Sequence, residues 1–181
     1  MDTSQIVYDC INGDERAFRR LVDLHADFAY AVACRMVNDE DEAKDIVQET
    51  FISVWRSLGK FDPARCFKSW LYRIIVNKCM DVLRKRKKTT FLHIEMNDQL
   101  VAVLERSGNQ EDHLNKKELE RLIEIATQKL SPKQKAVFVL SELEGLSHDE
   151  IVEITKMGKD AIKSNLNHAK RSIGRMIEKY L

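Results

Sequence analysis

The sequence predicts an all-α fold in which a flexible linker joins two small helical domains, the second containing a helix-turn-helix. Gly and Pro are scarce, with 6 and 2 residues among 181, and the common residues are good helix formers. Apolar residues recur at helical spacing in both halves of the chain, and this pattern fades over residues 89–111. We therefore expect a domain over residues 1–88, a linker over 89–111 and a second domain over 112–181.

The formal net charge of +1 conceals two segments of opposite charge. Acidic residues dominate residues 39–49, where Lys44 is the one basic residue. Residues 65–88 are strongly basic, and Asp81 is the one acidic residue among them. Because separated patches cancel in the sum, the net charge alone says little about binding partners.

The sequence favours a cytoplasmic protein without membrane insertion. It lacks a basic start followed by an apolar core, and no apolar run approaches the roughly 20 residues that span a bilayer. The cysteines, Cys10, Cys34, Cys66 and Cys79, lie far apart and form no C-x-x-C pair. We expect buried free thiols rather than a zinc site or a redox pair.

Residues 14–37 are predicted to form the first helix, which begins at Asn12 or Gly13. Its core-facing residues are expected to be Phe18, Leu21, Val22, Leu24, Phe28, Ala29, Val32, Ala33 and Met36. A second helix should lie between Asn38 and Gly59. Its apolar stripe is Ala43, Ile46, Val47, Thr50, Phe51, Val54, Trp55 and Leu58. Its outward residues are Asp41, Asp45, Gln48, Glu49 and Ile52. On charge pattern alone, an ordinary solvated surface explains that acidic face.

A basic amphipathic helix is predicted from Phe67 to about Lys87. Its apolar stripe is Phe67, Trp70, Leu71, Ile74, Ile75, Cys79, Val82 and Leu83. Basic residues beside aromatic ones can hold a phosphate backbone and stack an unpaired base. Trp70 lies on the stripe, which favours a core role, whereas Tyr72 and Asn77 fall off it and are better candidates for contact.

The second domain should begin with a helical block near Asp112. The apolar face of that block is Leu119, Leu122, Ile123 and Ala126. A capping box at Ser131 starts a helix that should run to about Leu143. A second box at Ser147 starts a short helix that should end near Met157 and Gly158. The last helix should face inward with Ala161, Ile162, Leu166, Ala169, Ile173 and Ile177.

The short capped helix from Ser147, the turn at Gly158 and the last helix form a helix-turn-helix pattern. The second helix of this pattern, which is the last helix of the chain, carries Lys159, Lys163, Asn165, Asn167, His168, Lys170 and Arg171. Lys and Arg neutralise phosphates and Asn can hydrogen-bond base edges, although a basic solvated face would share the charge pattern. Catalytic motifs are missing from the sequence, with neither a Gly-rich phosphate loop nor H-E-x-x-H, so we expect no enzyme activity, cofactor or metal.

Taken in order, these segments resemble the extracytoplasmic-function sigma factors of bacterial RNA polymerase. Residues 45–51 followed by Trp55 resemble that family's D-x-x-Q-E-x-F-x-x-x-W helix, which docks on the clamp helices of the polymerase β′ subunit. The resemblance implies a polymerase-binding set of Asp41, Asp45, Gln48, Glu49 and Ile52. The acidic face thereby acquires a partner.

Residues 67–77 are similar to the family segment that opens the minus-ten promoter element, and residues 61–66 match its base-capturing loop. In the family, an asparagine at the place of Asn77 helps to form the pocket for a flipped base. The minus-ten contacts that the resemblance implies are Phe61, Arg65, Lys68, Tyr72, Arg73, Asn77, Arg84 and Lys85.

Residues 130–132 and 145–151 look like the family's second domain, which binds the β-flap and reads the minus-thirty-five element. The implied contacts are Lys159, Lys163, Ser164, Asn165, Asn167, His168, Lys170 and Arg171. Residues 160–162 depart from the family's Gly-Thr-Val, and Asn165 and His168 stand where arginines are common. Fewer arginines should weaken phosphate binding.

The resemblance implies an alternative sigma factor that binds core RNA polymerase and promoter DNA and is held by an anti-sigma factor. An operator-binding helix-turn-helix regulator is the chief alternative, but it leaves the N-terminal half unexplained. A sigma-binding antagonist of the zinc class would carry a His and C-x-x-C cluster, which this sequence lacks.

Overall fold

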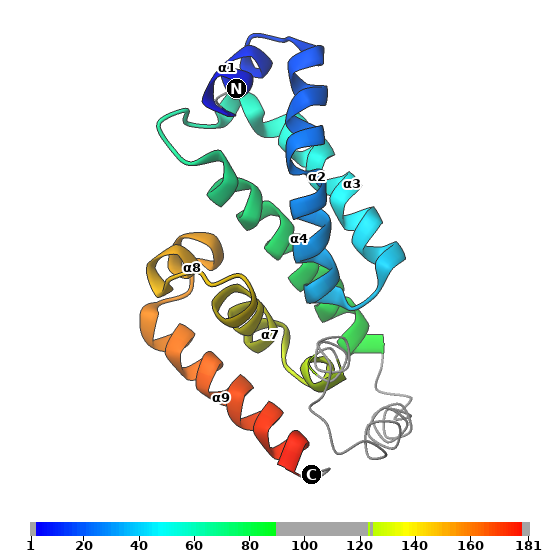
Figure 1. Cartoon of the computed structure of the whole chain (residues 1–181), viewed down its shortest axis with the longest axis vertical. Coiled ribbons are helices and arrows are strands. Elements are labelled where there is room, and N and C mark those ends of the chain that lie inside the picture. The colour runs from blue at the N-terminus through cyan, green and yellow to red at the C-terminus, as the bar shows by residue number, and fades with distance from the viewer. Residues whose placement is uncertain (1–2, 90–122, 124, 179–181) are drawn as a thin grey trace, which may run out of the picture.

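The computed structural model describes residues 3–89, 123 and 125–178, and these residues form helices and turns without a strand. The predicted linker beyond Thr89 and residues 112–122 of the second domain lie outside the described residues. Figure 1 shows α1 to α4 gathered in one half of the molecule and α7 to α9 in the other. None of the described helices is both long enough and apolar enough to cross a membrane.

The first half contains four α-helices and one short 3-10 turn. Their bounds are α1 Thr3–Ile11, α2 Glu15–Val37, α3 Glu40–Ser57, η1 Leu58–Lys60 and α4 Phe67–Thr89. In the described part of the second half, residues 125–128 are helical, and three further α-helices and a π-helical turn follow. Their bounds are α7 Pro132–Phe138, η2 Val139–Leu143, α8 His148–Thr155 and α9 Lys159–Glu178. The all-α prediction and the helix-turn-helix, formed by α8 and α9, are confirmed, whereas α1 was not predicted.

The ends of α2 and α3 lie close to their predicted positions, with different capping residues. Asp14, rather than Asn12 or Gly13, caps α2, because its carboxylate accepts hydrogen bonds from the N–H groups of Arg16 and Ala17. Asn38 ends α2 in the left-handed conformation, with φ 54°, and the neighbouring Asp39 caps α3. A single corner therefore closes one helix and opens the next.

Both predicted capping boxes are present in the second half. Ser131 and Gln134 cap α7 reciprocally, and Ser147 and Glu150 do the same for α8. The turn of the helix-turn-helix differs from the prediction, because α8 ends at Thr155 and the left-handed residue is Lys156, with φ 59°, rather than Gly158.

Helix α4 is the element that both halves share. It contacts α2 and α3 on one side and α7 and α8 on the other, as Figure 1 shows. Leu71, Ile75 and Cys79 of the predicted stripe are completely buried. A second stripe at four-residue spacing, Tyr72, Val76 and Met80, is buried as well. The helix therefore needs cover on two sides, and the two halves supply it.

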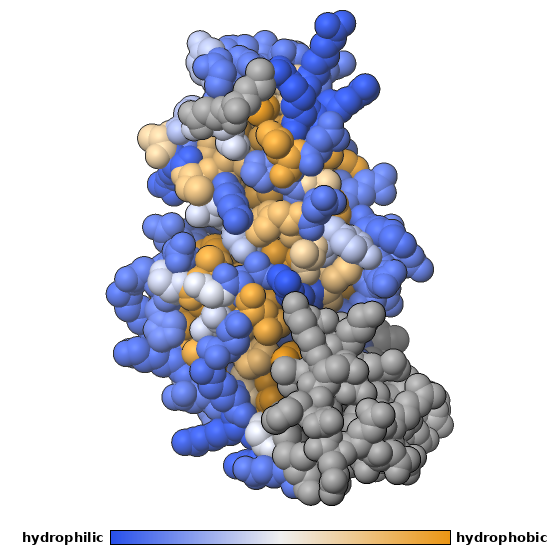
Figure 2. Space-filling view, in the orientation of Figure 1, coloured by the Kyte–Doolittle hydropathy of each residue, from blue (hydrophilic) through white to orange (hydrophobic). Residues whose placement is uncertain are grey.

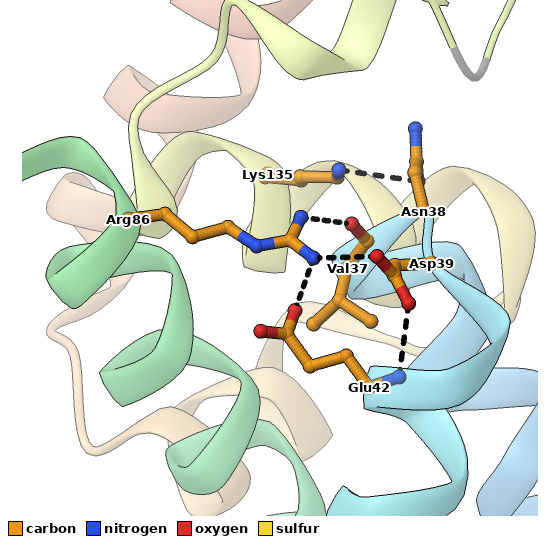
Figure 3. A network of polar contacts seen from close by, with 6 residues as sticks. All are labelled: Val37, Asn38, Asp39, Glu42, Arg86 and Lys135. Carbon is orange, nitrogen blue, oxygen red and sulfur yellow. Dashed lines mark hydrogen bonds and ion pairs between the residues drawn. The ribbon is translucent and has the colours of Figure 1, made fainter. Parts of the chain in front are cut away.

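Arg86 of α4 fastens the corner between α2 and α3 (Figure 3). Its guanidinium donates to the Val37 carbonyl oxygen at 2.9 Å and to the Asp39 carboxylate at 3.2 Å, and it also pairs with Glu42. The N–H of Glu42 and the nearby Arg86 charge lower the pKa of Asp39. From the second half, the ammonium of Lys135 donates to Asn38 Oδ1 at 3.2 Å.

We predict that Arg86→Met lowers the free energy of unfolding by about 1 to 2 kcal/mol, because a charged donor to a backbone carbonyl and two half-exposed ion pairs are lost. The control is Arg84→Met, which removes an ion pair with Asp81 on the same helix and should cost less than about 0.5 kcal/mol. Urea unfolding followed by circular dichroism measures both. Equal midpoints for the two variants would contradict the stabilisation of the corner between α2 and α3 by Arg86.

Candidate nucleic-acid and protein interfaces

The outward face of α3 is acidic at its N-terminal end and apolar at its C-terminal end. Asp41, Asp45, Gln48 and Glu49 are exposed, as the sequence predicts. Ile52, one turn further on, is 43% exposed, which is a large exposure for an apolar side chain. These residues share one side of the helix, so a partner can contact charge and apolar surface together.

Trp55 extends this face, contrary to the prediction that it is a core residue. The ring is 43% exposed, and its inner side packs edge-on against Phe18 of α2 with the ring centroids 4.7 Å apart. Leu24 was also expected in the core, and it is 57% exposed. Helical periodicity places a residue on the correct side of a helix, but it does not say how far the neighbouring helix reaches.

An aromatic cluster anchors the loop between η1 and α4. Phe61 is buried, and its ring centroid lies 5.9 Å from that of Phe67 and 4.9 Å from that of Trp70. Phe61 was expected to contact DNA, but its side chain instead fixes the start of the loop. Arg65, near the far end of the loop, is exposed beside Asp62 at 3.5 Å.

Beyond the first turn of α4, four of the residues predicted on this helix present their side chains to solvent. They are Arg73, Asn77, Arg84 and Lys85. Arg73, Asn77 and Arg84 lie within one narrow sector of the helix, because their spacings of four and seven residues are close to whole turns. Lys68 at the start of α4 is exposed too, with its ammonium 4.7 Å from the centroid of the Phe28 ring.

Tyr72 does not share this exposed face. It was predicted to lie off the apolar stripe and to be available for contact, but it is 4% exposed. Its ring packs edge-on against Phe28 of α2 at 4.6 Å, and its hydroxyl donates to Glu144 Oε2 at 2.8 Å. Burial, followed by the bond to the Glu144 carboxylate, raises the pKa of this phenol well above its usual value.

Glu144 is the interface residue that sequence reasoning missed. The guanidinium of Arg35 pairs with its other oxygen, Oε1, so that Glu144 joins α2 and α4 to the segment after η2. Arg35 and Glu144 lie 109 positions apart, and no local pattern links them.

Figure 2 shows apolar residues along the middle of one face of the molecule, with hydrophilic residues along its margins.

Helix α9 presents its predicted DNA-reading residues on a common exposed side. Lys159, Lys163, Ser164, Asn167, His168, Lys170 and Arg171 are all exposed. Two of the lysines already have acidic partners, Lys159 with Asp149 at 2.6 Å and Lys170 with Glu142 at 2.9 Å. Asn165 is half-buried, and its amide donates to the Ala161 carbonyl oxygen at 2.7 Å. A base edge would therefore compete with that backbone bond.

The cysteines are free, as predicted, but the prediction that they are buried is correct for only two of them. Cys10 and Cys79 are buried, Cys34 is half-buried and Cys66 is exposed at the end of the loop before α4. The backbone N–H of Ser69 in the first turn of α4 lowers the pKa of the Cys66 thiol. Within the described part of the chain, no cluster of His, Cys, Asp and Glu could hold a metal ion.

Two family models match the chain, one in each half. The Sigma-70 region 2 model matches residues 21–89, which cover most of α2 and all of α3 and α4. The Sigma-70, region 4 model matches residues 120–173, which cover α7, α8 and most of α9. Both matches agree with the order of segments that the sequence predicts.

Curated relatives match nearly the whole chain. The ECF RNA polymerase sigma factor SigW of Bacillus subtilis strain 168 is 33% identical over 175 residues, which are 91% of this chain and 91% of that protein. The RNA polymerase sigma factor CnrH of Cupriavidus metallidurans is 30% identical over 175 residues, covering 92% of this chain and 90% of that protein.

A solved structure of CnrH in complex with the cytosolic domain of CnrY has a similar fold. Its TM-score is 0.68 at 27% sequence identity, with 98% of this chain and 99% of that chain covered. The fold, the order of the exposed surfaces and the relatives agree, and the chain therefore belongs to the extracytoplasmic-function sigma factors of bacterial RNA polymerase.

Proposed function

We propose that the chain is an alternative sigma factor that binds core RNA polymerase and selects promoters through two DNA-reading helices, α4 and α9. The observation that carries the proposal is the order of three exposed surfaces: the acidic and apolar face of α3, the basic face of α4 and the basic face of α9. An operator-binding regulator would use the third surface alone. The chain acts by binding, and we assign it no catalytic step, cofactor or metal.

We assign residues 1–88 to a region 2 domain that docks on the β′ clamp helices through α3. The exposed set is Asp41, Asp45, Gln48, Glu49 and Ile52, to which the structure adds Trp55. Charge complementarity at the acidic end would set the orientation and the rate of association. Ile52 and Trp55 would supply the apolar contact area, because large exposed apolar side chains are typical of interface anchors.

The minus-ten element is proposed to lie along the exposed face of α4 and the loop before it. Arg73, Arg84 and Lys85 can neutralise backbone phosphates, and Asn77 between them can hydrogen-bond the edge of a flipped base. Phe61 would act indirectly, because its buried ring holds the loop in place for Arg65.

Residues 112–181 are proposed to form a region 4 domain that binds the β-flap and reads the minus-thirty-five element through α9, with residues 89–111 as the linker. The reading residues are Lys159, Lys163, Ser164, Asn165, Asn167, His168, Lys170 and Arg171. Their side chains lie on the second helix of the helix-turn-helix, the helix that enters the major groove in that motif.

We further propose that an anti-sigma factor binds this chain in the cytoplasm. CnrH, with 27% sequence identity in the solved structure, is bound to the cytosolic domain of CnrY. An inhibitor of that kind would cover the docking face of α3 or the DNA-reading faces and so prevent assembly with the polymerase.

The proposal is tested by adding the purified chain to a bacterial core RNA polymerase with a library of random-sequence templates, and then sequencing the transcript 5′ ends. We expect new start sites that share two upstream motifs at a fixed spacing, one motif for each reading helix. Start sites that are the same with and without the chain would contradict the proposed function.

Asp45→Lys should weaken binding to core polymerase roughly tenfold, because it reverses a charge at the centre of the α3 face. The matched control is Asp160→Lys, which makes the same charge change at the start of α9. Without DNA present, the control should bind core polymerase as the unaltered chain does. Competition with a labelled sigma factor gives the affinities, and an equal loss in both variants would rule out α3 as the docking helix.

A further inference from the structure

The carboxylate of Glu144 is held between two donors from the other half of the chain. Arg35, near the end of α2, pairs with Oε1 through its guanidinium. The hydroxyl of Tyr72 on α4 donates to Oε2 at 2.8 Å. Each carboxylate oxygen therefore has its own donor, and the two donors converge on one anionic group from two different helices.

Backbone hydrogen bonds fix the conformation of the chain around Glu144. The π-helical turn η2 ends there, with the Glu144 N–H donating to the Val139 carbonyl oxygen at 2.9 Å. The chain then turns through Gly145, with φ 68°, and the Leu146 N–H donates to the Leu140 carbonyl oxygen at 2.9 Å. The Glu144 side chain is 9% exposed, so the second half delivers its carboxylate into a shielded contact.

The two donors are of the kinds that bind phosphate. Arginine and tyrosine side chains both donate to backbone phosphate oxygens in protein–DNA complexes, and arginine pairs with carboxylate and phosphate in the same way. The ammonium of Lys68 lies 6.0 Å from the centroid of the Tyr72 ring and adds positive charge to the same neighbourhood. Tyr72 also adjoins Arg73, which the proposed function assigns to minus-ten DNA.

We infer that Arg35 and Tyr72 form a binding site for a phosphate of the nucleic-acid backbone, and that Glu144 occupies this site while the two halves are closed. The inference rests on the proposed function, in which the first half contacts DNA. The carboxylate of Glu144 then stands in place of a phosphate, and DNA competes with the second half for the same two donors. A chain with closed halves binds DNA more weakly, because its competent fraction is smaller.

The first test removes the charge of Glu144. Binding of the full chain to a fluorescein-labelled single strand of mixed sequence is measured by anisotropy, because backbone binding does not depend on sequence. Glu144→Gln should bind this strand roughly three- to tenfold more tightly than the unaltered chain. Glu153→Gln removes the same charge from an exposed position on α8 and is the control. Equal affinities for the two variants would overturn the masking by Glu144.

The second test removes the donors in the Glu144→Gln background. Adding Tyr72→Phe keeps the ring against Phe28 and should weaken binding about threefold, whereas adding Arg35→Gln should weaken it about tenfold. Loss of Arg35 should also reduce the slope of log affinity against log salt by about 0.7. Circular dichroism melting confirms that each variant is folded. Affinities equal to that of Glu144→Gln alone would overturn the phosphate site and leave a contact between the halves.

The assay contains no polymerase, so it separates this inference from the proposed function. If the Glu144, Tyr72 and Arg35 variants bind the strand as the unaltered chain does, while the chain directs new start sites, the phosphate site alone is contradicted. If the variants show the expected affinities, while start sites are the same with and without the chain, the proposed function is contradicted and the phosphate site stands.

Discussion

The rest of the structure depends on the burial of α4 along two adjacent stripes. One stripe includes Leu71 and Ile75, and the other includes Tyr72 and Val76. The helix contacts α2 and α3 in the first half and α7 and α8 in the second. A helix with so much apolar surface is stable only when both sides are covered. The packing of α7 and α8 against α4 covers part of this surface, and the contact between the halves places Glu144 beside Arg35.

The covering of α4 also connects the fold to the function. The first half carries the docking face of α3 and the basic face of α4, and both of these remain exposed when the halves are closed. The contact between the halves binds the Tyr72 hydroxyl to Glu144, and Tyr72 lies next to the exposed Arg73. Closure therefore leaves the proposed polymerase contact open while it takes away part of the proposed nucleic-acid surface.

Local sequence patterns were sufficient to predict the helices that have strong ends and regular apolar spacing. The capping boxes at Ser131 and Ser147 were predicted correctly, because their hydrogen bonds link residues three positions apart. Helix α1 was missed because its nine residues give too short a periodic pattern, and its stability comes from packing against α2. The positions of Tyr72, Trp55 and Leu24 depend on how neighbouring helices meet, which no local pattern records.

The proposed masking by Glu144 requires that the two halves pack against each other on α4 in the free chain and separate when promoter DNA binds. It is tested most directly by the distance between spin labels on exposed positions of α3 and α9, with the exposed Cys66 replaced by Ser. We predict a short, narrow distance distribution in the free chain and a longer one in the complex with core polymerase and promoter DNA. A distribution that stays short in that complex would contradict the account.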